Sequence, residues 1–330
     1  MKLTPMKLTK TIGSALAFCA QLLLSGACLA QASGYPDHPV KIIVPFAPAG
    51  PTDVSARLIA QKLSEQLKQQ FFIENQGGAG GNLGMGNAAK AAPDGYTILF
   101  VSSSYVVNPS LYAKVPYDPY KDFLPVTMAG DAPNLLSVHP SVPAKNVKEL
   151  VGLIKAGKYN NFAHAGVGTT PHLSGELFRL TFGLDLSAIP FPGAGPAIQS
   201  AVGGHTPILF SSLPPAVPMI KDGKLRALAV SSRKRAEVLP DVPTFAEEGL
   251  ADQEADTFQA VLVPAGTPKE IVALLHREIV KAVASPEVKE RFAMLGFDAV
   301  ANTPEEFAAQ IKVEIPKWGK VIKAANIRVE

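Results

Sequence analysis

The stretch VKIIVPFAPAGPTD, residues 40–53, decides the fold class. Residues 40–46 form a short apolar run that is typical of a buried strand, and the run ends in a loop rich in proline and glycine. From Asp53 to Leu67 the apolar residues recur at helical spacing, and Asp53 is expected to be the N-cap. A buried strand followed directly by a helix is the repeating unit of an α/β protein, so a parallel sheet is expected.

The same alternation extends outward from this stretch. A second strand, a glycine-rich loop over 77–86 and a short helix over 88–92 follow it, and the middle of the chain repeats the pattern. Three helices, each with a proline at its start, are expected near the C-terminus. The expected strands are 71–74, 96–102, 135–139, 161–165, 186–191, 208–210, 225–230 and 258–263, and the expected helices are 146–156, 172–182, 196–202, 214–222, 268–284, 286–295 and 304–325.

Two segments interrupt the alternation. Residues 105–130 contain several prolines and tyrosines, and residues 232–256 are also irregular. We interpret them as the places where the chain crosses between two lobes. The first lobe is then discontinuous, formed by 31–130 and 254–330, and the second lobe is 131–253.

The first 30 residues have the order of a secretory signal peptide. Three lysines and no acid precede an apolar run from Ile12 to about Leu24, and small residues follow. The run is too short for a membrane-spanning helix, which needs about 20 apolar residues. Cleavage is expected after Ala30 or Ala32, which predicts a periplasmic location for the mature chain.

Both cysteines of the chain, Cys19 and Cys28, lie in this segment. The mature chain is therefore expected to have no disulfide, no thiolate nucleophile and no cysteine metal site. Cys28 leaves a lipoprotein as the minor alternative. That alternative is disfavoured because Ser25 stands where a lipoprotein signal has a large aliphatic residue.

The charge balance also depends on the signal segment. The full chain has 31 Lys and Arg against 28 Asp and Glu, a net charge of +3. Without the three N-terminal lysines the mature chain has 28 of each, so its net charge is zero. There is no basic excess to attract nucleic acid or an anionic membrane, and neither is expected as a partner.

Two loops are candidates for a binding site, because ligands of open parallel sheets bind beyond the carboxyl ends of the strands. They are residues 45–53 and residues 165–172. Each brings small residues to the N-terminus of a helix, where free N–H groups and the helix dipole attract anions. Neither loop contains Lys or Arg. Ordinary capped turns remain an equally good interpretation of both loops.

Motifs for other chemistry are missing from the sequence. Pro171 stands where a dinucleotide fingerprint needs a third glycine, and the glycine-rich 77–84 lacks the Lys-Ser/Thr of a phosphate loop. There is no G-x-S-x-G elbow and no H-E-x-x-H spacing. We therefore expect no cofactor, no metal and no enzymatic activity. For His172 the preferred interpretation is a structural hydrogen bond, and for Asp53 it is a helix cap. Contact with a ligand is the second interpretation of both residues.

Several short motifs are distributed along the mature chain. In their order and spacing they resemble the Bug-type solute-binding receptors of tripartite tricarboxylate transporters. The motifs are YPDHPV at 35–40, the loop at 45–53, ENQGGAGGN at 74–82, PDGYT at 93–97, GKLRALAV at 223–230 and PAGTP at 264–268.

The resemblance implies a type II periplasmic-binding-protein fold, in which two α/β lobes are joined by crossing strands with a ligand cleft between them. It implies a monomer that binds a small carboxylate, such as a dicarboxylate or tricarboxylate, an aromatic acid or an amino-acid-like compound. The two loops would hold it through backbone amides, hydroxyls and ordered water. Carried over to this sequence, the ligand-binding residues are Phe46, Pro48, Ala49, Gly50, Asp53, Gly81, Asn82, Ser103, Ser104, Gly168, Thr169, Thr170, His172, Gly195 and Ser211.

The sequence departs from the family pattern at positions that bear on specificity. Ala49 stands where the family usually has glycine, and Ser211 stands where an aspartate is common. Residues 191–193 read Phe-Pro-Gly instead of Tyr-Lys-Gly, and Phe258 replaces a common tryptophan. Membership of the family would therefore not define the ligand.

The resemblance also implies a partner. The ligand-bound receptor would dock on the membrane subunits of a transporter. The alternative partner is a membrane sensor kinase, which the sequence does not distinguish from a transporter. An enzyme on the same scaffold is the third, less favoured class.

The substitution Asp53→Ala separates the capping role from ligand contact. A lost cap lowers the free energy of unfolding by about 1 kcal/mol, and we expect only a modest loss of ligand affinity. Chemical denaturation and a binding titration measure the two effects. A large loss of affinity at an unchanged melting temperature would contradict the structural role.

Overall fold

The computed structural model describes residues 34–250 and 252–329. The predicted signal peptide, its cleavage site and the lipoprotein alternative at Cys28 lie outside these residues. The chain divides after His38, and Pro39–Glu330 form one compact unit. All the helices and strands described below belong to this unit.

The first of two sheets has the strand order β11-β4-β10-β3-β1-β2. Its centre is the predicted parallel arrangement, because β1 lies between β2 and β3 and runs parallel to both. However, β10 is antiparallel to β3 and to β4, so the sheet is mixed. The strands are β1 (Val40–Val44), β2 (Phe71–Asn75), β3 (Thr97–Ser102), β4 (Phe123–Ala132), β10 (Thr257–Pro264) and β11 (Asp298–Ala299).

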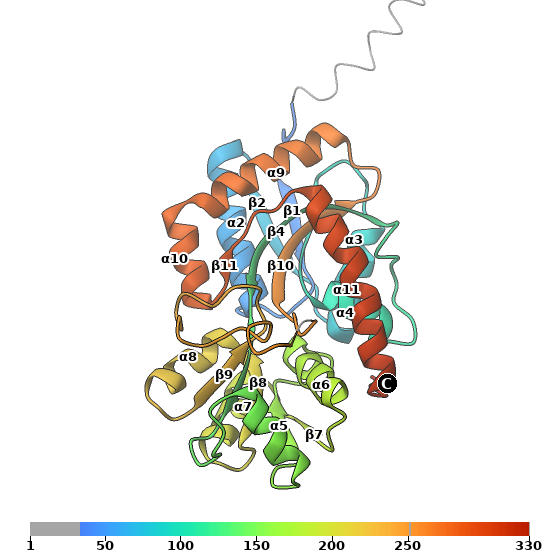
Figure 1. The fold of residues 1–330 in the computed structure, drawn as a ribbon. Coiled ribbons are helices and arrows are strands. Elements are labelled where there is room, and N and C mark those ends of the chain that lie inside the picture. Colours follow the sequence, from blue (N-terminus) through green and yellow to red (C-terminus); the bar gives the residue numbers. More distant parts are fainter. Residues whose placement is uncertain (1–33, 251, 330) are drawn as a thin grey trace, which may run out of the picture. The chain divides into compact units, whose positions relative to one another are not determined.

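Helices cover both faces of this sheet (Figure 1). One group, in which the helices pack on one another, is α2 (Pro51–Leu67), α9 (Lys269–Ala284) and α10 (Pro286–Leu295). On the other side are α3 (Asn82–Ala89), α4 (Ser104–Leu111) and α11 (Pro304–Ala324), with α11 packed along α4.

The second sheet has the order β7-β6-β8-β5-β9 and is also mixed, because β5 is antiparallel to both of its neighbours. Its strands are β5 (Asn134–Val138), β6 (Asn161–His164), β7 (Ser187–Pro190), β8 (Ile208–Ser212) and β9 (Arg226–Val230). Its helices are α5 (Val147–Lys155), α6 (Thr170–Phe182), α7 (Ala194–Val202) and α8 (Leu213–Lys221).

Side chains that alternate along the strands build a separate core on each face of the second sheet. Leu136 and Phe210 belong to the core beneath α5 and α6, whereas their neighbours Leu135 and Leu209 belong to the core beneath α7 and α8. This is the two-residue period of a strand. Because both faces are covered, apolar residues stand next to one another in the central strands, as in Leu135–Leu136 and Leu209–Phe210, rather than alternating with polar ones.

The α/β class is confirmed, and most predicted elements lie within a few residues of the observed ones. Residues 105–130 were predicted to be irregular, which is wrong, because they contain most of α4 and of β4. Pro109 lies inside α4, where a proline removes a backbone donor. The helix forms nevertheless, because it packs against α11.

The glycine-rich loop predicted at 77–86 is also shorter than expected. A 3₁₀ turn occupies Ala79–Gly81, and α3 begins directly after it at Asn82. The two-residue strand β11 had no signal in the sequence. Within the described part of the chain, no helix is both long enough and apolar enough to span a membrane.

Hydrogen bonds join the two points where the chain passes from one sheet to the other. β4 of the first sheet ends at Ala132, and β5 of the second begins at Asn134. The N–H of Asn134 donates to the hydroxyl of Ser231 at 2.8 Å, and that hydroxyl donates to Asp256 Oδ1 at 2.5 Å. Outgoing and returning segments are therefore tied together by side chains as well as by the β4–β10 ladder.

Three carboxyl groups gather beside these crossing segments. In the register of the sheet, Asp131 of β4 lies opposite Asp298 of β11 on one side and opposite Phe258 of β10 on the other. Burial, with the charges of Asp256 and Asp298, raises the pKa of Asp131 to about 7. Burial likewise raises the pKa of Asp256 to about 6, although the bond from Ser231 acts in the opposite direction.

These raised pKa values predict a loss of stability between about pH 4 and pH 7. In this range the unfolded chain ionises while the folded chain keeps the protons, so stability falls as the pH rises. The substitution Asp131→Asn removes one such group. We expect it to raise the melting temperature strongly at about pH 8, less at about pH 5 and hardly at all below about pH 4, as measured by thermal denaturation over the pH range.

Asp118→Asn is the control of opposite sign. The N–H of Tyr120 donates to this carboxyl at 2.9 Å and lowers its pKa, so its stabilising effect is present at neutral pH and is lost on acidification. Asp118→Asn should therefore destabilise the protein at neutral pH. If Asp131→Asn followed the same pH dependence as this control, the assignment of Asp131 would be wrong.

Candidate ligand-binding site

The first loop connects β1 to α2. Helix α2 begins at Pro51 with Gly50 as its N-cap, so the prediction that Asp53 is the N-cap is wrong. The reason is Pro51, whose fixed φ and missing N–H suit the first helical position and start the helix two residues before Asp53. Gly50 has no side chain that could accept a hydrogen bond, so no N-cap side chain pairs with the N–H groups of the first turn.

Asp53 instead reaches back from the first turn and holds the loop. Its carboxylate accepts hydrogen bonds from the N–H of Ala49 at 2.8 Å, from Arg57 Nε at 2.9 Å and from Asn75 Nδ2 at 2.8 Å. Asn75 Nδ2 also donates to the carbonyl of Phe46 at 3.1 Å. The loss of stability expected for Asp53→Ala therefore comes from three unpaired donors and not from a lost cap.

Asp53 is only 2% exposed, and yet its side chain ionises readily. Burial acts to raise its pKa, but the hydrogen bonds from Arg57, Asn75 and Ala49 outweigh burial, so the pKa lies below its usual value. The carboxylate is therefore charged at neutral pH, with its oxygens committed to the protein.

Ala49 shows what this network holds in place. Its φ of 66° lies in the left-handed region, which a residue with a Cβ adopts at a cost. Glycine, common here in the resembling family, would adopt it freely. Pro48 and Ala49 are exposed and Phe46 is half-buried, so the loop presents backbone and small side chains to its surroundings.

The second loop connects β6 to α6, and its helix is capped by a side chain. Thr169 is the N-cap: its hydroxyl donates to the carbonyl of Gly166 at 2.7 Å and accepts from the N–H of His172 at 3.4 Å. The predicted start at His172 is two residues late, because α6 begins at Thr170. The Thr169 hydroxyl is thus used inside the loop.

His172 braces the same loop from behind. Its Nδ1 accepts from the N–H of Gly168 at 3.1 Å, and its ring stacks on His164, with centroids 4.1 Å apart and planes inclined by 15°. Burial, with the charge of His164, lowers the pKa of His172 to about 3, and burial lowers the pKa of His164 to about 4. Both rings are therefore neutral at neutral pH, and His164 Nε2 is buried without a partner.

Helix α4 joins the second loop to the start of α3. Gly168 of the second loop, with φ 78°, lies so close to α4 that an added Cβ would stand 2.3 Å from Leu111 Cδ2. One turn earlier, Asn108 Nδ2 donates to Asn82 Oδ1 and to the carbonyl of Gly80, both at 2.9 Å. The start of α3 is thereby fixed to the helix that the second loop touches.

Further contacts complete the group. An added Cβ on Gly81 would lie 3.4 Å from Phe46 Cε1, so Gly81 is beside the first loop. The hydroxyl of Thr170 is hydrogen-bonded to that of Thr257 at the start of β10. Ser103 Oγ accepts from the N–H of Phe258 in the same strand at 2.8 Å.

The structure thus brings together most of the predicted residues, either in the loops or through α3, α4 and β10. Ser104, half-buried, is the first residue of α4 and adjoins Ser103. Gly195 is exposed in the first turn of α7, and Ser211 is buried in β8 with an unpartnered hydroxyl. No hydrogen bond among the described residues joins Gly195 or Ser211 to the two loops, so their roles stay predictions.

Four residues of this group were not predicted from the sequence: Asn108, Leu111, Thr257 and His164. The first two were hidden because residues 105–130 were treated as irregular. The apolar spacing of Tyr105, Val106 and Leu111 after two serines was the available signal for α4. Nothing in the sequence pattern indicated that His164 would stack on His172.

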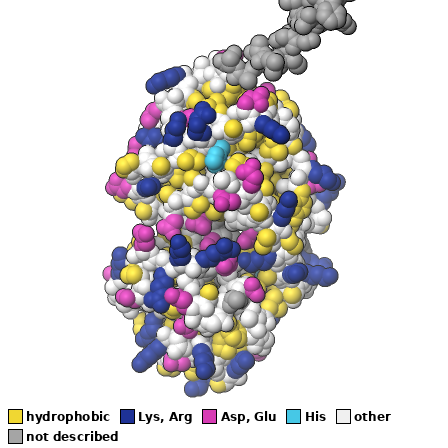
Figure 2. Space-filling view, turned by 45° about the horizontal axis from the view of Figure 1, so that its top comes forward, with side chains coloured by type: hydrophobic (Ala, Val, Ile, Leu, Met, Phe, Trp, Pro, Cys, Tyr) yellow, Lys and Arg dark blue, Asp and Glu magenta, His cyan; other side chains and the backbone are white. Residues whose placement is uncertain are grey.

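The chemistry available at the two loops is that of neutral donors. Neither loop contains Lys or Arg, so an anion there would meet N–H groups, hydroxyls and the positive ends of helix dipoles. In the described residues no three or more His, Cys, Asp or Glu side chains form a group that could hold a metal. Charged side chains of both signs are interspersed on the face shown in Figure 2.

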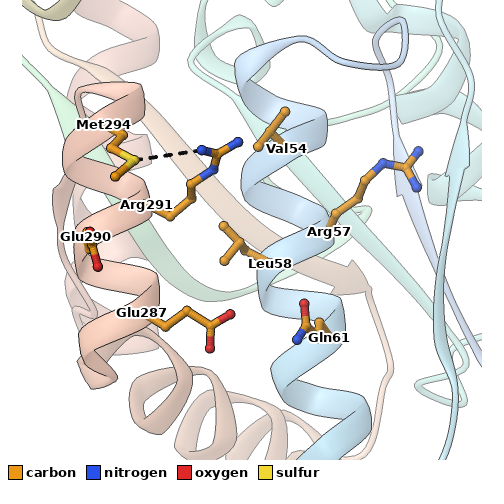
Figure 3. A pocket seen from close by; sticks show the side chains of 8 residues that line it. All are labelled: Val54, Arg57, Leu58, Gln61, Glu287, Glu290, Arg291 and Met294. Carbon is orange, nitrogen blue, oxygen red and sulfur yellow. Dashed lines mark hydrogen bonds between the residues drawn. The ribbon is translucent and has the colours of Figure 1, made fainter.

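A cavity of about 410 Å³ lies elsewhere, between α2 and α10 (Figure 3). Leu58 and Val54 line it from α2, and Glu287, Arg291 and Met294 line it from α10. Arg57 lies at its edge and turns its guanidinium away from α10. The predicted loop residues do not line this cavity.

Comparisons with known proteins agree with the resemblance. The family model described as "Tripartite tricarboxylate transporter family receptor" matches residues 55–327. Protein BugT of Bordetella pertussis is 38% identical over 303 residues, which cover 91% of this chain and 93% of BugT.

Solved structures share the fold at similar identity. The periplasmic binding protein BugD is 34% identical, with a TM-score of 0.72 over 90% of this chain and 100% of BugD. Rpa4515 of R. palustris, solved with adipate, is 34% identical, with a TM-score of 0.74 over 89% and 99% of the two chains. MatC of Rhodopseudomonas palustris, solved with bound malate, is also 34% identical, with a TM-score of 0.70 over 87% and 100%.

The contact between Gly168 and Leu111 can be tested by stability. Gly168→Ala adds a Cβ at positive φ and also against Leu111, so we expect a cost of about 1 kcal/mol for the backbone and about 1–3 kcal/mol more for the overlap. Urea denaturation measures the loss of unfolding free energy. In a Leu111→Ala background the second part of the cost should disappear.

Gly157→Ala is the matched control. Gly157 has nearly the same φ, 72°, but nothing lies within 4 Å of an added Cβ. It should show the backbone cost alone. Equal losses at Gly157 and Gly168 would contradict the close approach of the second loop to α4.

Proposed function

Because the chain belongs to the tripartite tricarboxylate transporter receptor family, we propose that it is a periplasmic solute-binding protein for a small dicarboxylate or tricarboxylate. In this proposal the chain binds and releases its ligand unchanged. It would deliver the ligand to the membrane subunits of a transporter, which membership of a transporter receptor family supports.

One observation carries the proposal: two loops without Lys or Arg each end at a helix N-terminus, and contacts link them in sequence. The second loop touches α4, α4 is bonded to the start of α3, and Gly81 just before α3 lies beside the first loop. The N-terminal turn of a helix attracts a carboxylate through its free N–H groups and its dipole. Two such turns suit a ligand with a carboxylate at each end. Adipate and malate, present in the structures of two relatives, are both dicarboxylates.

The neutral surroundings of the two loops support a reversible site. Asp53 is the charged residue of the first loop, and its oxygens are occupied by protein donors. His164 and His172 are neutral behind the second loop. The incoming carboxylate therefore meets neither a free anion nor a bare cation, and binding depends on hydrogen bonds that exchange readily with water.

We further propose that the two sheets belong to two lobes, 31–130 with 254–330 and 131–253, which close on the ligand. The first loop lies in the first of these and the second loop in the other. A ligand bound by both would favour the closed arrangement by its differential affinity for it. The Thr170–Thr257 bond and the Gly168–Leu111 contact would then be contacts of the closed arrangement.

The test is a thermal-shift titration of residues 31–330 with adipate, malate, citrate and benzoate. A ligand that binds only the folded state stabilises it by about 2.7 kcal/mol at 100 times its dissociation constant, so the melting temperature should rise with concentration by several degrees. We expect the rise with at least one dicarboxylate or tricarboxylate.

Benzoate, with one carboxylate, is the control for the second anchoring point. A rise with benzoate alone would contradict the dicarboxylate class while keeping a carboxylate receptor. No rise with any compound, for a sample shown by native mass spectrometry to carry no copurified ligand, would contradict the proposed function.

A further inference from the structure

A closed ring of hydrogen bonds lies behind the first loop. Arg57, one turn further along α2, donates from Nε to Asp53 Oδ2 at 2.9 Å and from Nη2 to Asn75 Oδ1 at 3.1 Å. Asn75, at the end of β2, donates from Nδ2 to Asp53 Oδ1 at 2.8 Å. Each of the three side chains is therefore bonded to the other two.

Two further bonds extend from this ring to the backbone of the loop. Asn75 Nδ2 donates to the carbonyl of Phe46, and Asp53 Oδ2 accepts from the N–H of Ala49. The two anchored residues lie on either side of Ala47 and Pro48. The ring thus holds both ends of the exposed part of the loop, including the left-handed turn at Ala49.

Arg57 contributes more here than a surface ion pair does. Exposed pairs are weak, and the side chain of Arg57 is itself 53% exposed, but its partner carboxylate is 2% exposed. Because the guanidinium is planar and rigid, it bonds a carboxylate and an amide at the same time, which fixes their relative orientation. A lysine has a single nitrogen and cannot reproduce this geometry.

We propose that Arg57 and Asn75 are positioning residues, which set the first loop in its ligand-binding conformation before the ligand arrives. This inference rests on the proposed function, because it assumes that the loop binds the ligand. Neither residue needs to touch the ligand. Their effect on affinity arises because a loop that is already ordered does not lose conformational freedom on binding.

Arg291 provides a matched control on the neighbouring helix. Both arginines border the cavity between α2 and α10, and both are exposed (Figure 3). Arg291, however, contacts only the sulfur of Met294, at 3.8 Å, among the hydrogen bonds of the described residues. Arg291→Ala removes the same charge and the same side chain without touching the ring.

The experiment compares wild type, Arg57→Ala, Arg57→Lys, Asn75→Ala and Arg291→Ala in two measurements. Hydrogen exchange, read by mass spectrometry over residues 46–53, reports the order of the loop without any ligand. Calorimetric titration with adipate and with malate reports affinity. Melting temperatures identify any variant that fails to fold.

We expect Arg57→Ala and Asn75→Ala to accelerate exchange of the loop roughly tenfold and to weaken binding roughly tenfold, with Arg291→Ala equal to wild type in both. Arg57→Lys should resemble Arg57→Ala, because charge alone does not restore the second bond. If Arg57→Lys restored both slow exchange and affinity, the geometric argument would fail.

Other outcomes overturn the inference separately from the proposed function. Exchange of Arg57→Ala equal to that of Arg291→Ala would show that the ring does not hold the loop. Faster exchange with unchanged affinity would show that the order of the loop does not set binding. If wild type bound none of the carboxylates of the thermal-shift titration, the proposed function would be contradicted, and the exchange comparison would still decide whether Arg57 and Asn75 hold the loop.

Discussion

Asp53 is a carboxylate that is almost fully buried, and it stays charged only because three donors face it. That requirement constrains everything around the first loop. It fixes the side chain of Arg57 on α2, the amide of Asn75 at the end of β2 and the backbone of Ala49 and Phe46. A buried charge without such partners would protonate, and the loop would lose the group that holds its turn.

The second loop is held by other means. Its helix is capped by Thr169, and its turn is supported by a pair of stacked, neutral histidines rather than by a charge. The two loops are thus held by different interactions. They are alike in that each places backbone N–H groups at the start of a helix. Such groups bind an anion by geometry and dipole, without the long-range attraction of a cation.

Helix α4 is the element that joins the second loop to the start of α3, beside which the first loop lies. It is short and contains Pro109, so its stability depends on α11, which packs along it. Its side chains contact Asn82 on one side and Gly168 on the other. Close approach is possible because residue 168 is a glycine, which both adopts the positive φ and leaves room for Leu111. Near the crossing strands, by contrast, Asp131 and Asp256 are carboxyls that burial holds partly protonated.

The sequence by itself determined the α/β class, the two candidate loops and the resemblance to the family. These follow from local patterns: apolar runs, helical spacing, glycines and prolines at fixed offsets. Local patterns also explain why the helix boundary at Pro51 was missed, because two good signals, a proline for the first turn and an aspartate for the cap, compete within three residues.

Only the three-dimensional structure decided that Asp53 holds a loop instead of capping a helix. The same is true of the contact between Leu111 and Gly168 and of the stacking of His164 on His172. Each of these features depends on residues that packing brings together. No short sequence pattern encodes such contacts.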